Sequence, residues 1–259
     1  PDLDVQGVRQ MTMEQLFVRL LYEDWDEKKY RIQKHAQTGN QGSVKGSLHW
    51  YEDLKTYCDE LEWNSILRES IYLNPRQFVE GCKDGKIGVY DESGTLPEGK
   101  PVLLVDGAAV ERYIRQTPKV SMQNKITMLN ERLLNKVKEE FLGKGIKYTE
   151  AERKAILRAY RNRYGGKVWK GSIYELYSDF LAKQNAKGME VDVPDNAFDV
   201  YDLAALAYIY KRIKETEVIS EAHHIVIDEA QDYYPLQFEI LQMLFKQVKF
   251  TVLGDINQT

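Results

Sequence analysis

Two consecutive acids near the end of the chain are the residues best placed to do chemistry. Asp228 and Glu229 come directly after the apolar run at 225–227, and Asp255 closely follows a second apolar run at 250–253. Adjacent carboxylates can divide the work of hydrolysing a nucleoside triphosphate, because one can hold Mg²⁺ while the other orients the attacking water. Solvated acid pairs at strand ends are also common, so the pair by itself leaves a structural role open.

The elements that must position these acids are predicted to be a strand, a helix and a second strand. Residues 225–227 are too few for a typical helix and are all β-branched, so we expect a buried strand flanked by other strands. Pro235 suits a first helical position, and an apolar stripe from Leu236 onward predicts the helix. The result is a βαβ unit with carboxylates at the carboxyl ends of both strands, which is where open α/β sheets bind their ligands.

Composition limits the class of protein. The 259 residues can form one large domain or two smaller ones, and 43% hydrophobic with 29% charged residues is ordinary for a globular protein. No apolar run approaches the ~20 residues that span a bilayer, so no membrane contact is expected. The net charge of −4 restricts any nucleic-acid contact to a local surface. Two cysteines, Cys58 and Cys82, are too few for a disulfide framework, so we expect a protein of the reducing cytoplasm. No His or Cys pair has the spacing of metal ligands.

The rest of the chain predicts mostly helices. Thr12 is a plausible N-cap for a first helix, and the polar, Gly-rich stretch at 34–47 predicts a loop. Further helices are expected over 48–85 and 108–184, and an amphipathic one over 198–213, just before the strand with the acids. A small β element is expected from the apolar runs at 87–90 and 101–105.

Two strings around the acids together resemble a known family. IVIDEAQD, residues 225–232, and TVLGDINQ, residues 251–258, resemble the Walker B and G-D-x-x-Q motifs of superfamily 1 helicases of the UvrD/Rep/PcrA type. Superfamily 2 members also carry DEA at this strand, but they continue to a Ser-Ala-Thr motif. The resemblance implies ATP and Mg²⁺ as cofactors, with these site residues: Asp228 for Mg²⁺, Glu229 as base for water, Gln231 and Asp232 as organisers, Gly254 and Asp255 completing the second motif, and Gln258 as sensor of the γ-phosphate.

The segment VRQMTMEQLFVRLL, residues 8–21, looks like a diverged T-F-H-S motif, in which a strand leads into a helix that contacts the DNA backbone. Thr12 would be its phosphate-facing residue, while Met13 and Glu14 replace the usual Phe and His. A P-loop of the form G-x-x-x-x-G-K-[ST] does not occur in the sequence. We therefore expect a piece of a longer motor that does not hydrolyse ATP by itself.

The predicted fold class is α/β: part of a P-loop (RecA-like) domain over 1–24 and 191–259, with a mainly helical insertion over 25–190 that carries the small β element. The Q-M-T string and the DLAALAYIY helix look closest to the helicase IV-like HelD branch. That resemblance implies an ATP-driven protein that binds bacterial RNA polymerase and helps to release it from nucleic acid. A UvrD-class DNA-unwinding repair helicase and an isolated protein-binding module remain alternatives.

A basic segment lies inside the predicted insertion. Residues 136–170 contain eleven Lys or Arg against four Glu, with aromatic residues between them. Such a segment can be a solvated helical face, or it can contact single-stranded DNA or an acidic surface of RNA polymerase. Lys154, Arg158 and Arg161 are spaced by four and three, so they share one helical face and are the candidate contacts. Arg153 and Arg163 are expected mainly on the same side, with Ile156, Leu157 and Tyr160 turned inward.

Overall fold

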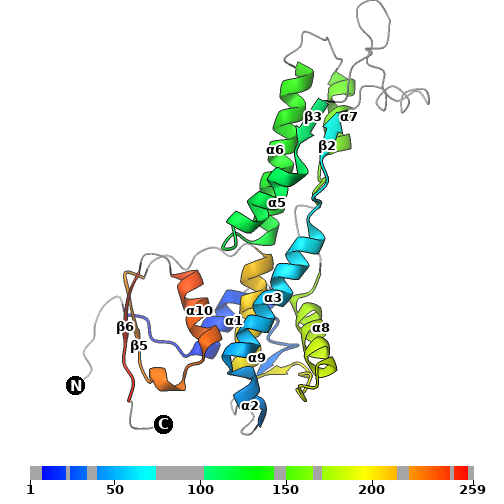
Figure 1. Cartoon of the computed structure of the whole chain (residues 1–259). Helices are drawn as coiled ribbons and strands as arrows, with labels where there is room; N and C mark the ends of the chain where they lie inside the picture. The colour runs from blue at the N-terminus through cyan, green and yellow to red at the C-terminus, as the bar shows by residue number, and fades with distance from the viewer. Residues whose placement is uncertain are drawn as a thin grey trace, which may run out of the picture. The chain divides into compact units, whose positions relative to one another are not determined.

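The computed structural model describes residues 8–21, 24–33, 40–73, 102–142, 150–165, 171–214, 222–245 and 248–255. The chain divides into two compact units (Figure 1). Unit 1 comprises Pro1–Glu60 and Lys170–Thr259, and unit 2 comprises Leu61–Trp169. The first unit therefore contains the acid pair, and the second contains the basic segment.

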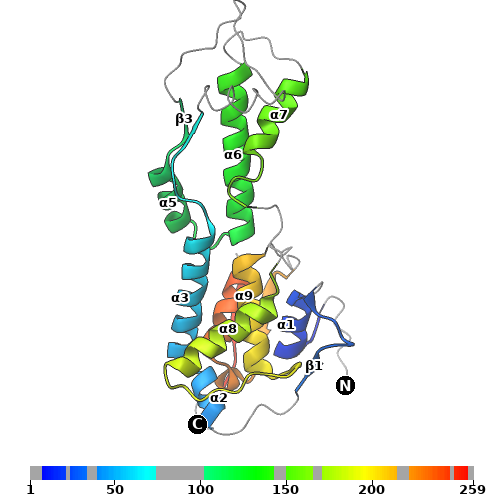
Figure 2. The same ribbon diagram turned by 90° about the vertical axis from the view of Figure 1, so that its right-hand side faces the viewer.

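Helix α9, Val200–Ile213, is the centre of unit 1. Helices α1 (Met13–Leu21), α8 (Ile173–Ala186) and α10 (Pro235–Leu244) pack against it (Figure 2). Every residue from 201 to 210 is buried. The prediction of an amphipathic helix was therefore wrong, because α9 is covered by helices on several sides and leaves no polar face for solvent.

The start of α9 is held by buried polar groups. Asp199 and Asp202 form a capping box, and Asp202 Oδ1 also accepts from Lys45 Nζ at 2.7 Å and from the Tyr177 hydroxyl at 2.6 Å. Lys45 ends helix α2, Asn40–Lys45, so the predicted loop at 34–47 is partly helical. The Lys45 contact explains this difference, since a buried ion pair fixes a segment whose composition alone favours a loop.

The predicted βαβ unit is present. Strand β5, His224–Ile227, pairs in parallel with β6, Lys249–Val252, and α10 lies between them in the chain, with Pro235 at its first position. The predicted burial of β5 was wrong: Val226 is 60% exposed, and β6 is the only neighbour of β5 among the described residues. A second parallel pair joins β1, Arg31–Ile32, to β4, Ala197–Phe198.

Unit 2 begins within helix α3, Leu48–Ser65. Strand β2, Ile71–Leu73, pairs antiparallel with β3, Val102–Val105, so the expected helix over 48–85 is interrupted by a strand. The predicted helix at 74–85 and strand at 87–90 lie outside the described residues. Three helices follow, as predicted for this part of the chain: α5 (Gly107–Gln116), α6 (Met122–Leu142) and α7 (Glu150–Tyr160).

The core of unit 2 forms along α6. Leu129, Leu133 and Val137 recur at spacings of four on its buried side. Lys125, on the same helix, is fully buried and pairs with Glu62 at 2.5 Å. No helix in the described ranges is long and apolar enough to cross a membrane. The division into motor residues and an insertion over 25–190 stays a prediction.

Candidate functional site

The acid pair sits at the turn where β5 ends. Asp228 and Glu229 are both exposed, and the Glu229 N–H donates to Asp228 Oδ1 at 3.0 Å. Glu229 has a φ of 51°, in the left-handed region. This conformation costs a residue with a Cβ on the order of 1 kcal/mol, and such outliers cluster at functional sites. The turn places the two neighbouring carboxylates at the carboxyl end of β5.

The side-chain amide of Gln231 joins the two acidic loops. Gln231 belongs to the short 3₁₀ helix η2, Ala230–Asp232, which follows the acid pair directly. Its Nε2 donates to Glu229 Oε2 at 2.6 Å, and its Oε1 accepts from the Asp255 N–H at 3.0 Å. The backbone adds a second link, because the Ala230 N–H donates to the Leu253 carbonyl at 2.8 Å. The ends of β5 and β6 are therefore one connected site.

Gly254 makes room for this amide. A Cβ at position 254 would lie 2.9 Å from Gln231 Oε1, closer than side chains normally approach. Its φ is not in the left-handed region, so the requirement for glycine here is one of space. The structure thus brings together four of the residues predicted from the sequence: Glu229, Gln231, Gly254 and Asp255. Gln258 lies outside the described residues.

Thr12 caps helix α1, as predicted. The Gln15 N–H donates to Thr12 Oγ1 at 3.3 Å, and the Thr12 N–H donates to Gln15 Oε1 at 3.0 Å. This reciprocal arrangement satisfies donors that a helix N-terminus leaves free. Thr12 is exposed, and its predicted contact with a phosphate backbone stays a prediction.

Tyr233 was not predicted to belong to the site. Burial raises the pKa of its phenol, and the carboxylates of Glu14, Asp228 and Asp232 raise it further. The phenol is therefore close enough to these three carboxylates for their charges to raise its pKa. Nothing in the sequence marks Tyr233 except its place after Asp232, because Glu14 is far away in the chain.

The basic segment is in unit 2. Ile156 is buried, and Lys154, Arg158 and Arg161 are exposed, as predicted. Leu157 and Tyr160 are only partly buried, and Arg161 lies in the turn after α7, which ends at Tyr160, so the predicted orientation is confirmed only in part. Lys154 pairs with Glu150 at 2.7 Å, but both side chains are largely exposed. Exposed pairs of this kind contribute little and exchange readily. The face is free of any other ion pair that involves these three residues in the described part of the chain.

A family model for the UvrD/REP helicase N-terminal domain matches residues 5–259. The chain belongs to the UvrD/Rep helicase family. No curated protein matches it closely enough to be compared. The superfamily 1 resemblance of the two acidic motifs is therefore confirmed at the level of the family. UvrD/Rep proteins are helicase-like motors that use ATP with a metal ion and act on nucleic acid, and the mixed helical fold with small sheets is consistent with part of such a motor.

The acid pair of this UvrD/Rep chain suits a magnesium ion that arrives with its substrate. No cluster of three or more His, Cys, Asp or Glu able to hold a metal is found among the described residues. Mg²⁺ commonly uses only one or two protein carboxylates, together with substrate phosphates and water. An exposed carboxylate at Asp228 fits that mode of binding, whereas a site for a permanently bound ion needs more protein ligands.

Proposed function

We propose that this chain supplies the hydrolytic acids of an ATP-driven superfamily 1 motor of the HelD-like branch, which couples ATP hydrolysis to remodelling of nucleic acid or RNA polymerase complexes. The observation that carries the hydrolytic part is the Gln231 amide, which holds Glu229 and the Asp255 loop together at 2.6 and 3.0 Å. This link supports a catalytic role, because it fixes the orientation that a carboxylate needs to act as a base.

The proposed roles rest on the motif resemblance, and the geometry at the end of β5 supports them. Asp228 holds Mg²⁺, and Glu229, turned to the same strand end, accepts the proton of the attacking water. Gln231 orients the Glu229 carboxylate, with Asp232 and the Gly254–Asp255 turn supporting it, and Gln258 contacts the γ-phosphate. Bound ATP and Mg²⁺ supply the phosphoryl group and the charge compensation for its transfer. Because the 259 residues contain no P-loop sequence, we propose that the chain alone does not turn over ATP.

The charges of the two units support a local nucleic-acid contact. Unit 2, Leu61–Trp169, contains 20 Lys or Arg against 14 Asp or Glu, a net charge of +6. The remaining residues contain 16 against 26, a net charge of −10. Polyanions such as single-stranded DNA are attracted to unit 2, and the face of Lys154, Arg158 and Arg161 is the proposed contact.

A UvrD-class DNA-unwinding helicase is the second candidate, since the family match itself favours it. One experiment separates the two. The intact motor and its Glu229→Gln variant are purified, tested for co-purification with RNA polymerase, and assayed for ATP turnover and for unwinding of a 3′-tailed duplex. Under the proposal the polymerase co-purifies, and Glu229→Gln keeps nucleotide binding but loses most turnover. Unwinding without polymerase binding would select the second candidate, and equal loss of nucleotide binding would make Glu229 structural.

A further inference from the structure

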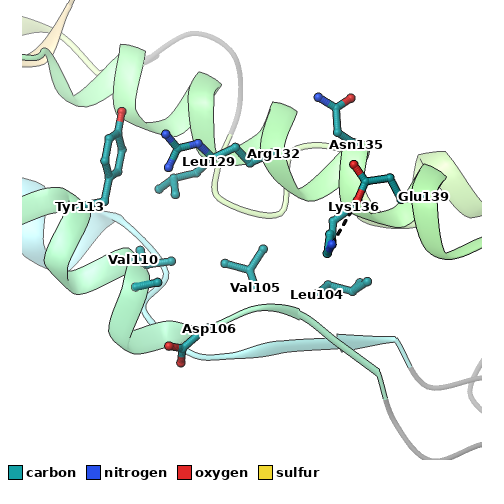
Figure 3. Close-up of a pocket in the computed structure, with 11 residues that line it drawn as sticks. Leu104, Val105, Asp106, Val110, Tyr113, Leu129, Arg132, Asn135, Lys136 and Glu139 are labelled. Carbon is teal, nitrogen blue, oxygen red and sulfur yellow. Dashed lines mark hydrogen bonds and ion pairs between the residues drawn. The ribbon is translucent and has the colours of Figure 1, made fainter.

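Unit 2 has an open groove that the hydrolytic site does not use. It has a volume of about 450 Å³ and lies between helix α6 on one wall and the β3–α5 segment on the other (Figure 3). Leu104, Val110 and Leu129 form its apolar floor, and all three are buried. The volume is in the range that receives a small ligand or a few side chains of a peptide. None of the three proposed α7 contacts lines it.

One cation on the groove is already oriented. The Arg132 guanidinium lies 4.9 Å from the centre of the Tyr113 ring, and both side chains line the groove. No ion pair with Arg132 is found among the described residues. Stacking on an aromatic ring leaves the N–H fork of an arginine free for a carboxylate and reduces the entropy lost on binding. The guanidinium of Arg132 is therefore available to bind an anion.

The two acids of the groove, Asp106 and Glu139, both have partners within unit 2. Asp106 Oδ1 accepts from the Ala108 N–H at 3.2 Å and caps α5. Glu139 pairs with Lys136 at 3.1 Å, one turn along α6, and both are about half exposed (Figure 3). An exposed pair of this kind opens at little cost, which leaves Lys136 available to an incoming carboxylate. The groove thus offers an apolar floor beside two cations.

The lining favours a peptide over a nucleotide. Bases are held by aromatic faces, but the floor here is aliphatic and one face of Tyr113 is covered by Arg132. A carboxylate beside an aliphatic side chain matches the arrangement of cations and floor.

We propose that this groove binds an acidic peptide segment of a partner protein, in which an aliphatic side chain enters the floor and an adjacent carboxylate pairs with Arg132. The site is separate from the acid pair and from the α7 face, so it does not depend on the hydrolytic proposal. Its occupant is a protein, whereas the α7 face is proposed to meet nucleic acid.

The test uses the 259-residue chain and a fluorescent twelve-residue peptide of alternating Asp and Leu, followed by anisotropy. Arg132→Glu reverses the free cation, and Ala109→Trp fills the groove from an exposed position on α5. Each is expected to weaken peptide binding at least about tenfold. The controls Arg112→Glu and Ala108→Trp are at exposed positions of α5 that do not line the groove, so they should change affinity less than twofold.

Three further measurements make the outcome decisive. A Lys–Leu peptide should bind more weakly, because it lacks the carboxylate, and an Asp–Ser peptide should bind more weakly, because it lacks the aliphatic group. Thermal unfolding of each variant checks that the fold is kept, and Arg132→Glu alone decides if Ala109→Trp fails to fold. Unchanged affinity in the groove variants, or equal losses in the controls, would overturn the proposal. Displacement of the peptide by oligo-dT from the wild type, together with oligo-dT binding that Arg132→Glu weakens and Arg112→Glu does not, would reassign the groove to nucleic acid.

Discussion

Gln231 donates a hydrogen bond of 2.6 Å from its Nε2 to Glu229 Oε2. The same amide is held at its other end, because Gln231 Oε1 accepts from the Asp255 N–H. An amide fixed through its oxygen presents its NH₂ in one direction, so the orientation of the Glu229 carboxylate depends on the loop after β6. In the proposed hydrolysis, a movement of that loop would therefore change the orientation of the Glu229 carboxylate, which is the proposed base.

The first prediction concerns this link in the intact motor. Gln231→Ala should lower kcat for ATP about tenfold to a hundredfold with little change in KM, because the substrate contacts remain while the base loses its orientation. Steady-state ATPase assays measure both constants. Gln242→Ala, on the exposed side of α10, is the matched control and should behave as wild type. Parallel changes of KM would assign Gln231 to substrate binding.

Gly254→Ala should resemble Gln231→Ala. The new Cβ would lie 2.9 Å from Gln231 Oε1, so the amide must move and its contact with the Asp255 N–H weakens. We expect a fall in kcat in the same direction, and an additional effect of less than about 0.5 kcal/mol when both substitutions are combined, since they act on one interaction. Full additivity in this double-mutant cycle would show that Gly254 acts independently of Gln231.

The left-handed backbone at Glu229 predicts a stability difference in the isolated chain. Glu229→Gly should be more stable than Glu229→Ala by about 1 kcal/mol, because only glycine adopts a φ near 51° without steric cost. Urea unfolding measures the difference. At Glu60, an exposed position inside α3, the order should reverse, with glycine less stable than alanine by about 1 kcal/mol. The same order at both positions would contradict the strained turn.

The capping box of α9 predicts a dependence of stability on pH. Burial raises the pKa of Asp199 to about 6, and the neighbouring Asp202 contributes to the rise. The folded chain then holds a proton that the unfolded chain has lost between about pH 4 and pH 6, so stability from this group falls as pH rises through that window.

Asp199→Asn keeps an N-cap side chain and removes the titration. Its unfolding free energy should match that of the wild type near pH 3.5 and exceed it by up to roughly 3 kcal/mol at pH 7.5. Urea unfolding at several pH values measures this difference, with the exposed Asp195→Asn as the control. A difference that does not change with pH would show that Asp199 is not the titrating group.

The last prediction concerns the α7 face. Reversal of Lys154, Arg158 and Arg161 to Glu should weaken binding of the chain to single-stranded DNA. The slope of log affinity against log salt concentration should fall in magnitude by about 2, because fewer counterions are released when three phosphate contacts are lost. Fluorescence titrations over a salt series measure both. Reversal of the exposed cations Arg112, Lys119 and Lys138 makes the same change in net charge within unit 2 and should have a smaller effect. Equal effects would indicate general electrostatics instead of a contact face.

The sequence by itself determined the features that depend on near neighbours in the chain. The acids after β5, Pro235 at the start of α10 and Thr12 at the start of α1 were all predicted and are found there. Helix caps, helical periodicity and strand-end carboxylates are local, because they involve residues within about four positions of each other. The parallel βαβ order follows in the same way from two short apolar runs joined by one helix.

Tertiary structure alone decided which distant residues meet. Lys45 lies 157 positions from Asp202, and their ion pair explains the helix at 40–45 inside a stretch whose composition predicts a loop. The burial of α9 on several sides depends on helices from both ends of the chain, and the groove beside Arg132 depends on the packing of α6 against β3 and α5. Composition and periodicity indicate which secondary structure each segment favours. These contacts depend instead on how segments far apart in the sequence pack against one another.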